Sequence, residues 1–347
     1  MNGAAAEPVG AEIRDYLKLG LRNRWWPLGP SSLAGAAPAG ITRLGEKLVL
    51  WRGADGAVHV QADYCPHRGV PLSRGANCGD RLRCAYHHVE IGPDGTVLRV
   101  PGEPGSALVG RPLVHTYPAL ECKGAVFAYF GDALHALPPA FSVPLQLRDD
   151  GPYDAFLCYA EWPTFWRYLY DNNMDPMHGT FLHAISHSMS EGATEAVFRT
   201  RDTPTGFFVE KETQRDTNFD WSELVDDGSL YARLEIPYPR SAGPGGNFGI
   251  ISYATPIDER STACFFWRTR KVAGWQRDLW RFLYRERLER RHGEVLEQDR
   301  AMLTGCEPGL ERYEHLYGHD VGVVHLRRHL MREARAQLTA LKSAGVR

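Results

Sequence analysis

The sequence predicts an α+β fold class, with an N-terminal region built of strands and a C-terminal region that combines strands with helices. Between about Trp25 and Asp132, short apolar runs such as "KLVLWR" and "AVFAYF" alternate with the turn-forming segments "GADGA", "GPDGT" and "PGEPG". Short strands separated by turns at intervals of roughly eight to twelve residues are typical of a small β domain.

The second region begins after the proline-rich segment "DALHALPPAFSVP". Its strand-like runs are "GFFVEKETQRD", "SLYARLEIPYP", "FGIISYATPI" and "TACFFWRTRKV". Apolar residues then recur at helical spacing over 274–303 and 323–344. Strands grouped apart from helices are typical of an α+β domain. We expect one domain at 22–137 and a second at 138–347, with 1–21 forming an N-terminal helix that packs on the rest.

The composition is that of an ordinary globular protein, since 43% of the 347 residues are hydrophobic and 24% are charged. The 40 basic and 42 acidic residues give no electrostatic case for nucleic acid or a membrane as partner. The N-terminus lacks a signal-peptide pattern and no apolar run is long enough to cross a bilayer, so we expect a cytoplasmic protein. A reducing compartment disfavours disulfides, and clustered cysteines there indicate a metal site.

The segment "CPHRGVPLSRGANCGDRLRCAYHH" pairs Cys65 with His67 and Cys84 with His87. Zinc accepts two thiolates and two imidazoles, whereas a [2Fe-2S] cluster takes two cysteines on one iron and two histidines on the other. Each short pair here contributes one residue of each type, so each loop can reach both irons. This mixing favours a cluster over a zinc finger. Structural zinc, and His88 as the ligand in place of His87, remain alternatives.

A second motif, "DNNMDPMHGTFLH", places Asp175 and His178 three residues apart, on one face of a helix. His178 and His183 are five residues apart, so we expect the helix to bend or end between them, with Gly179 well placed for the break. Two imidazoles and a distant carboxylate would form the facial triad of non-haem Fe(II) sites. Open alternatives are a helix with ordinary polar residues, a zinc hydrolase, and His187 as a ligand in another register.

Together, and in this order, the two motifs resemble those of the Rieske non-haem iron oxygenases. "CPHRG" and "CAYHH" are similar to that family's cluster loops, CxHRG and CPYHGW, with Ala85 at the usual proline and His88 at the usual glycine. The family's iron segment, N-x2-D-x2-H-x4-H, is matched by Asn172, Asp175, His178 and His183. The segment "LKLGLRNRWWPLG" also looks like the family's entry to the Rieske domain, and "DVGVVHLRRHL" looks like its C-terminal helix.

The resemblance implies two metal sites on an all-β Rieske [2Fe-2S] domain and a catalytic domain of helix-grip or START-like type, an antiparallel sheet with helices. The cluster ligands would be Cys65, His67, Cys84 and His87, and the mononuclear iron ligands His178, His183 and Asp299. Glu297 is an alternative to Asp299. Asn172 would lie next to the iron ligands without binding the iron itself.

The resemblance also implies a head-to-tail homotrimer in which Asp175 accepts a hydrogen bond from His87 of the adjacent subunit. Asp175 would then be the electron-transfer bridge between the cluster of one subunit and the iron of the next. Such carboxylates fix the orientation of a ligand imidazole.

The implied function is that of a terminal oxygenase, the alpha component of an aromatic ring-hydroxylating or demethylating system. O2 would be the co-substrate, and electrons would come from NAD(P)H through a separate ferredoxin and/or flavin reductase, because the chain has no nucleotide-binding glycine fingerprint. We expect hydroxylation or O-/N-demethylation of an aromatic or heterocyclic compound. Alternatives are cis-dihydroxylation of an arene at the same site, a Rieske electron carrier, and a zinc-stabilised binding module.

The walls of the substrate pocket would come from residues around Phe181, from 247–254 and from the helix that carries Asp299. No cluster of basic residues marks a carboxylate-bearing substrate.

Overall fold

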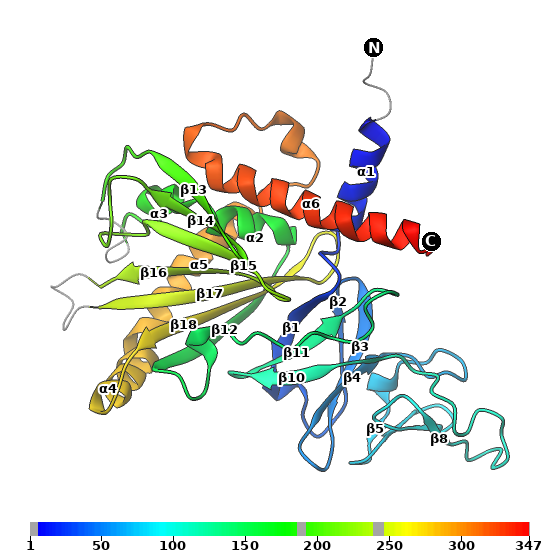
Figure 1. Cartoon of the computed structure of the whole chain (residues 1–347). Coiled ribbons are helices and arrows are strands. Elements are labelled where there is room, and N and C mark those ends of the chain that lie inside the picture. Colours follow the sequence, from blue (N-terminus) through cyan, green and yellow to red (C-terminus); the bar gives the residue numbers. More distant parts are fainter. Residues whose placement is uncertain (1–5, 186–191, 239–245, 347) are drawn as a thin grey trace. The chain divides into compact units, whose positions relative to one another are not determined.

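The described residues of this computed structural model, 6–185, 192–238 and 246–346, form two units (Figure 1). One unit comprises residues 25–138, and the other comprises residues 1–24 together with 139–347. The predicted fold class is confirmed, because the first unit is built of strands and short 3-10 turns, whereas the second combines one large sheet with helices.

Eleven short strands form three antiparallel sheets in the unit of residues 25–138, in the orders β1-β11-β10, β2-β3-β4-β9 and β5-β6-β7-β8. The strands are β1 (Arg24–Pro30), β2 (Ala39–Arg43), β3 (Glu46–Arg52), β4 (Val58–Ala62), β5 (Ala76–Asn77), β6 (Leu82–Arg83), β7 (Glu90–Ile91), β8 (Val97–Arg99), β9 (Thr116–Tyr117), β10 (Ala119–Cys122) and β11 (Ala125–Phe130). The β5-β6 hairpin lies between the two Cys-His loops in the chain, so its pairing brings those loops together.

The other unit contains one seven-stranded antiparallel sheet in the order β12-β18-β17-β16-β15-β14-β13. Its strands are β12 (Tyr153–Trp162), β13 (Phe198–Thr203), β14 (Gly206–Lys211), β15 (Trp221–Asp226), β16 (Leu230–Pro237), β17 (Asn247–Pro256) and β18 (Thr262–Lys271). Strands β13 to β18 form a meander in which each strand pairs with the next along the chain. β12, which comes first in the chain, pairs with β18 and forms one edge of the sheet.

Six α-helices accompany the sheet in the described part of the chain: α1 (Ala6–Leu17), α2 (Trp166–Asn173), α3 (Pro176–Leu182), α4 (Trp275–Leu283), α5 (Glu289–Leu303) and α6 (Val321–Ser343). The helix expected over 274–303 is interrupted, since a π-helical segment, Tyr284–Leu288, joins α4 to α5. None of the described helices is both long enough and apolar enough to cross a bilayer.

The register of the central strands defines one face of this sheet. Leu234 is paired with Ile250, and Ile250 with Arg268, so these three side chains point to the same side. Helix α5 packs on this side, where His292 stacks on Phe248 with ring centroids 4.9 Å apart. The face that carries Arg268 is therefore covered by the helix that carries Asp299.

Helices α2 and α6 pack on the same face. The Asn173 amide of α2 donates a hydrogen bond to Ser252 Oγ at 3.0 Å, and His329 Nε2 of α6 lies 2.9 Å from the Asp226 carboxylate. Burial by itself would raise the pKa of Asp226, but hydrogen bonding to His329 and the charge of Arg24 hold it below its ordinary value. One helix-covered face thus positions the site described below.

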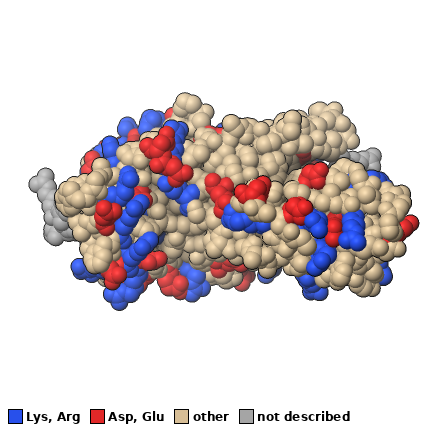
Figure 2. Space-filling view, turned by 90° about the horizontal axis from the view of Figure 1, so that it is seen from below, with Lys and Arg blue, Asp and Glu red and all other residues tan. Residues whose placement is uncertain are grey.

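Charged side chains are distributed without separation of sign on the face shown in Figure 2. Lysines and arginines alternate there with aspartates and glutamates. This distribution matches the near balance of 40 basic and 42 acidic residues in the sequence.

Candidate functional site

The four predicted cluster ligands are brought together at the ends of two loops. Cys65 and Cys84 are 2% and 1% exposed, whereas His67 and His87 are exposed and their ring centroids lie 4.6 Å apart. Burial, and to a lesser degree the adjacent Cys84 thiol, raise the pKa of Cys65 to about 11. Two adjacent buried thiols are unfavourable as bare thiolates, and a bound cationic centre removes that penalty. The donor set therefore fits a [2Fe-2S] cluster.

The two loops have the same backbone geometry. In each, the cysteine amide donates to the carbonyl five residues later, and the cysteine carbonyl accepts from the amide four residues later. The residue that supplies this last amide is Gly69 in one loop and His88 in the other, with φ of 72° and 57°. His88 thus occupies the left-handed position where the family usually has glycine, and the loop shape is preserved.

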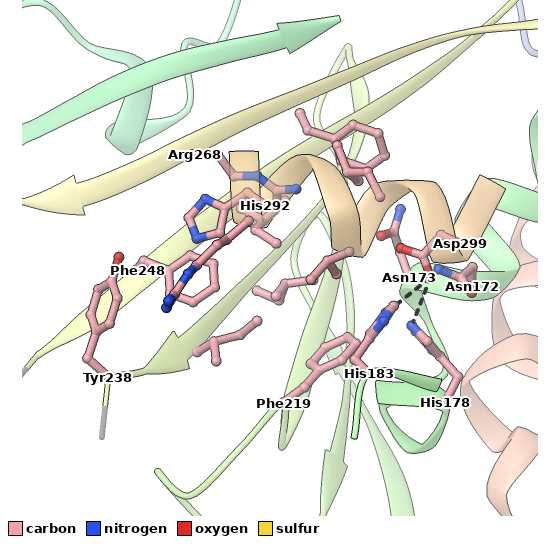
Figure 3. Close-up of a pocket in the computed structure, with 17 residues that line it drawn as sticks. Asn172, Asn173, His178, His183, Phe219, Tyr238, Phe248, Arg268, His292 and Asp299 are labelled. Atoms are coloured by element: carbon pink, nitrogen blue, oxygen red, sulfur yellow. Dashed lines mark ion pairs between the residues drawn. The ribbon is translucent and has the colours of Figure 1, made fainter. Parts of the chain in front are cut away.

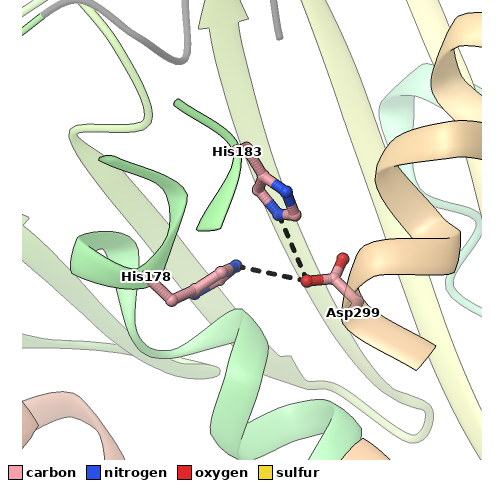
Figure 4. Close-up of side chains that lie close together, drawn as sticks. All are labelled: His178, His183 and Asp299. Carbon is pink, nitrogen blue, oxygen red and sulfur yellow. Dashed lines mark ion pairs between the residues drawn. The ribbon is translucent and has the colours of Figure 1, made fainter. Parts of the chain in front are cut away.

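The side chains of His178, His183 and Asp299 also converge (Figure 4). Each offers one potential ligand atom, and these three atoms all lie within 4.8 Å of one another. Asp299 Oδ1 lies 3.7 Å from His178 Nε2 and 3.2 Å from His183 Nε2. This carboxylate oxygen is buried and has no hydrogen-bond partner among the described residues. Two imidazoles facing an unsatisfied buried carboxylate fit a divalent cation, and the set matches the facial triad of Fe(II) sites.

Helix α3 positions the two histidines. Asp175 is its N-cap and accepts a hydrogen bond from the Met177 amide at 2.9 Å, which places His178 in the first turn. His183 is the C-cap residue, so its side chain leaves the helix axis and turns toward His178. The helix ends at Leu182, between the two histidines as expected, but the position expected for the break is wrong, because Gly179 is buried inside α3.

Hydrogen bonds at Nδ1 orient both imidazoles. His183 Nδ1 lies 2.8 Å from Gln298 Oε1, and His178 Nδ1 contacts the backbone carbonyl of Asp175. Because both partners are acceptors, Nδ1 carries the proton and the Nε2 lone pair faces Asp299 in each ring. Sequence reasoning missed Gln298, although it adjoins Asp299 on α5.

The electrostatic balance at His183 shows how strongly the carboxylate acts on it. Burial by itself would lower the pKa of His183, but the neighbouring Asp299 carboxylate and, less strongly, Gln298 outweigh burial and raise that pKa above its ordinary value. The imidazole and carboxylate therefore bind a positive charge between them, a proton where no metal is bound.

The structure distinguishes between the alternative ligands. Glu297 points to solvent, with its side chain 59% exposed, and pairs with Arg300, so Asp299 is the carboxylate that faces the histidines. His187 lies outside the described residues. Asn172 lines the same pocket as the triad (Figure 3).

A pocket extends from the triad between the sheet and α5 (Figure 3). Its walls are mainly apolar, and their larger side chains are Phe219, Leu234, Ile236, Phe248, Ile250, Phe266 and Leu296. β17 and α5 thus contribute walls, as expected. Of the residues around Phe181, His178 and His183 line the pocket, whereas the side chain of Phe181 itself is 61% exposed and lies outside the lining.

Two family models match this chain. The model of the Rieske [2Fe-2S] domain matches residues 25–118, and that of the vanillate O-demethylase oxygenase C-terminal domain matches residues 162–336. The chain belongs to the Rieske non-haem iron oxygenase family. In this oxygenase the Cys-His loops lie in the first matched region, and His178, His183 and Asp299 lie in the second.

Two curated relatives of this Rieske oxygenase show how far the similarity extends. The phthalate 4,5-dioxygenase oxygenase subunit of Pseudomonas putida is 28% identical over 272 residues, 71% of this chain and 59% of that protein. A vanillate O-demethylase oxygenase subunit from a Pseudomonas species, strain HR199, is 33% identical over 172 residues, 49% of this chain and 47% of that protein. The matches thus span about half to three fifths of these relatives.

Solved structures share the fold over nearly the whole chain. The terminal oxygenase of carbazole 1,9a-dioxygenase from Novosphingobium sp. KA1 superposes with a TM-score of 0.74 at 24% identity, covering 95% of this chain and 97% of that one. Dicamba monooxygenase bound to dicamba superposes with a TM-score of 0.68 at 19% identity, covering 92% and 98%.

Substitutions at the adjacent histidines 87 and 88 separate ligand from loop residue. We expect His87→Ala to lose the cluster, because one iron would keep a single imidazole. We expect His88→Gly to keep the cluster and to gain up to about 1 kcal/mol of stability, since glycine adopts this positive φ without a Cβ clash. Visible absorption and thermal unfolding of the purified holoprotein measure both effects. The reverse pattern would make His88 the ligand.

Removing the Asp299 carboxylate tests the second centre. We expect Asp299→Asn to reduce bound iron from about three to about two atoms per chain while the cluster spectrum persists, because a neutral amide is a poor ligand for Fe(II). Glu297→Gln, two residues away on the same helix, is the matched control and should retain all the iron. Elemental analysis alongside acid-labile sulfide gives the count, and full iron content in Asp299→Asn would contradict the assignment.

Proposed function

We propose that this chain is the terminal oxygenase of a multicomponent Rieske system that hydroxylates, or removes an O- or N-methyl group from, an aromatic or heterocyclic compound. The observation that carries this proposal is the triad of His178, His183 and Asp299 at one end of an apolar pocket, in a chain that also has a Rieske domain. O2 is the co-substrate, and NAD(P)H acts indirectly through a separate reductase.

The residues of the pocket have distinct tasks. His178, His183 and Asp299 would hold Fe(II), which would supply O2 binding and the reduction of O2 with electrons from the cluster. Gln298 and the Asp175 carbonyl keep the two imidazoles in place. The aromatic and aliphatic walls bind an apolar ring and exclude water from it.

Electrons reach the pocket, in this proposal, from the cluster of an adjacent subunit in a cytoplasmic head-to-tail homotrimer. His87 is exposed and adjoins the buried thiols, so it provides an exit at the surface. The side chain of Asp175 is 30% exposed, while its backbone carbonyl contacts His178. Asp175 can therefore accept a hydrogen bond from His87 of the neighbouring subunit. Because its carbonyl also contacts His178, Asp175 alone would connect His87 to a proposed iron ligand.

The proposed partners and reaction type are inferred from proteins that are similar to this chain. A solved structure of carbazole 1,9a-dioxygenase contains the oxygenase in complex with ferredoxin, which supports a ferredoxin and/or flavin reductase as the electron donor here. The curated relatives include a vanillate O-demethylase, a chloroacetanilide N-alkylformylase and a 3-chlorobenzoate-3,4-dioxygenase. Their range keeps cis-dihydroxylation of an arene as the second candidate. A plain Rieske electron carrier is disfavoured because residues 138–347 contain a second set of side chains, His178, His183 and Asp299, that fits a metal ion.

Consumption of O2 and NADH with a surrogate ferredoxin and reductase tests the proposal against a panel of aromatic compounds. Substrate-dependent uptake with 18O in the product is expected. One labelled hydroxyl or released formaldehyde indicates monooxygenation, and two labelled atoms in a diol indicate dioxygenation. A colourless protein that contains zinc and no acid-labile sulfide would refute the oxygenase.

The bridge predicts a specific phenotype for Asp175→Asn. Asparagine also caps helices well, so we expect α3 and both metal centres to persist while substrate-coupled O2 consumption falls by at least about 100-fold. Glu294→Gln, which removes an exposed charge on α5, should leave turnover unchanged. Iron content, the cluster spectrum and single-turnover reduction are the measurements, and normal turnover in Asp175→Asn would exclude the bridge.

A further inference from the structure

The far part of the pocket contains a buried guanidinium without a counter-ion. Arg268 lies on β18, is 2% exposed and lines the pocket together with the triad. Its Nε is buried without a hydrogen-bond partner, and no hydrogen bond or ion pair joins it to another of the described residues. Its one described ring contact is with Phe266, whose ring centroid lies 5.6 Å from Cζ.

Other buried cations in this protein have oxygen partners. Arg43 donates from Nε to the carbonyl of Leu28 at 2.7 Å. Lys211 Nζ forms no hydrogen bond within the described part of the chain, but it lies 3.7 Å from the Asp220 carboxylate and so has a counter-ion. An uncompensated buried charge is costly, and arginine does not escape the cost by losing its proton. Arg268 is thus an exception that the fold of the chain itself does not explain.

The position of Arg268 follows from the strand register. It shares the helix-covered face with Ile250 and Phe266, and both of these line the pocket. Figure 3 shows Arg268 and the triad as separate groups along the same pocket. A ligand that filled this space would contact the guanidinium with one part, the aromatic walls with its middle, and the triad with another part.

A guanidinium selects for a planar oxyanion. Its N–H groups form a fork that matches both oxygens of a carboxylate, and the pairing is strongest where water is excluded. An anion bound there would also provide the missing counter-charge for Arg268. The apolar walls between favour a ring over a flexible polar chain.

We propose that Arg268 binds the carboxylate of the substrate, and that the substrate is an aromatic or heteroaromatic carboxylic acid. This assignment rests on the proposed function and narrows it. The ring lies against Phe248, Ile250 and Phe266, and the reacting carbon or methyl group faces His178, His183 and Asp299. Arg268 is a specificity residue, distinct from the metal ligands.

Binding measurements without a reductase test this assignment separately from turnover. The probes are methoxy-substituted benzoates and the corresponding benzamides, titrated into the holoprotein by calorimetry. We expect the wild type to bind the acid at least tenfold more tightly than the amide. We expect Arg268→Gln to weaken acid binding at least tenfold and to change amide binding by less than about twofold, because only the acid loses a charged partner. Arg268→Lys should retain part of the preference.

Arg290→Gln is the matched control, since it removes an exposed arginine on α5 and should leave both affinities unchanged. Equal wild-type affinity for acid and amide would overturn the assignment, as would an equal loss of both in Arg268→Gln. If Arg268→Gln does not fold, the wild-type preference and the Arg268→Lys variant still decide. Acid-selective binding without substrate-dependent O2 uptake would support the anion site and refute the oxygenase. Substrate-dependent O2 uptake without acid-selective binding would support the oxygenase and refute the anion site.

Discussion

A buried carboxylate oxygen that faces two imidazoles is the constraint on which the catalytic unit depends. Asp299 Oδ1 has no hydrogen-bond donor among the described residues, yet it lies 3.2 Å from His183 Nε2. A buried anion in this position is stable only with a cation beside it. The surrounding elements can be understood as the means of holding three ligands at this distance. Helix α3 has Asp175 as its N-cap and His183 as its C-cap, which places both histidines at its ends. Helix α5 packs on the sheet with Asp299 on its buried side.

The same pocket carries charges of both signs, at Asp299 and at Arg268. Between them the walls are apolar, so each charge is poorly screened by water and acts strongly on what binds. In the proposed function the Asp299 carboxylate binds the metal, whereas the Arg268 guanidinium binds the organic ligand. A ligand with one anionic end would therefore bind in a single orientation, with its neutral part toward the metal. Orientation is what decides which carbon atom is oxidised when the oxidant itself is unselective.

The parts of the site that were predictable from the sequence are those in which local spacing fixes the geometry. Cys65 and His67 lie on one turn, and Cys84 and His87 on another, so residue type and spacing were sufficient to propose the cluster. The match of His88 to a glycine position was visible too, but its positive φ required the structure. Asp299 was proposed only by resemblance, since more than a hundred residues separate it from His183.

The features that were not predictable depend on tertiary structure. Gly179 was expected to break α3, but it lies buried inside the helix, which ends instead at Leu182 with His183 as the C-cap. The π-helical segment at 284–288 has no signature in the apolar periodicity. Arg268 is one basic residue in the strand "TACFFWRTRKV", and only the pairing of β18 with β17 shows that it points into the pocket.

The contrast between buried thiols and exposed imidazoles has a consequence for electron transfer. Cys65 and Cys84 are buried whereas His67 and His87 are exposed, so a bound cluster would be covered at its thiolate ligands and would meet the surface at its imidazole ligands. An electron acceptor must then approach the imidazoles directly. Asp175 suits that approach because it has two separate contacts, a partly exposed carboxylate and a backbone carbonyl at His178. One residue thus serves as helix cap, as support for an iron ligand and, in the proposed trimer, as the connection to the next subunit. Of these roles, only the proposed connection to the next subunit requires a carboxylate, because asparagine also caps helices well and the backbone carbonyl does not depend on the side chain.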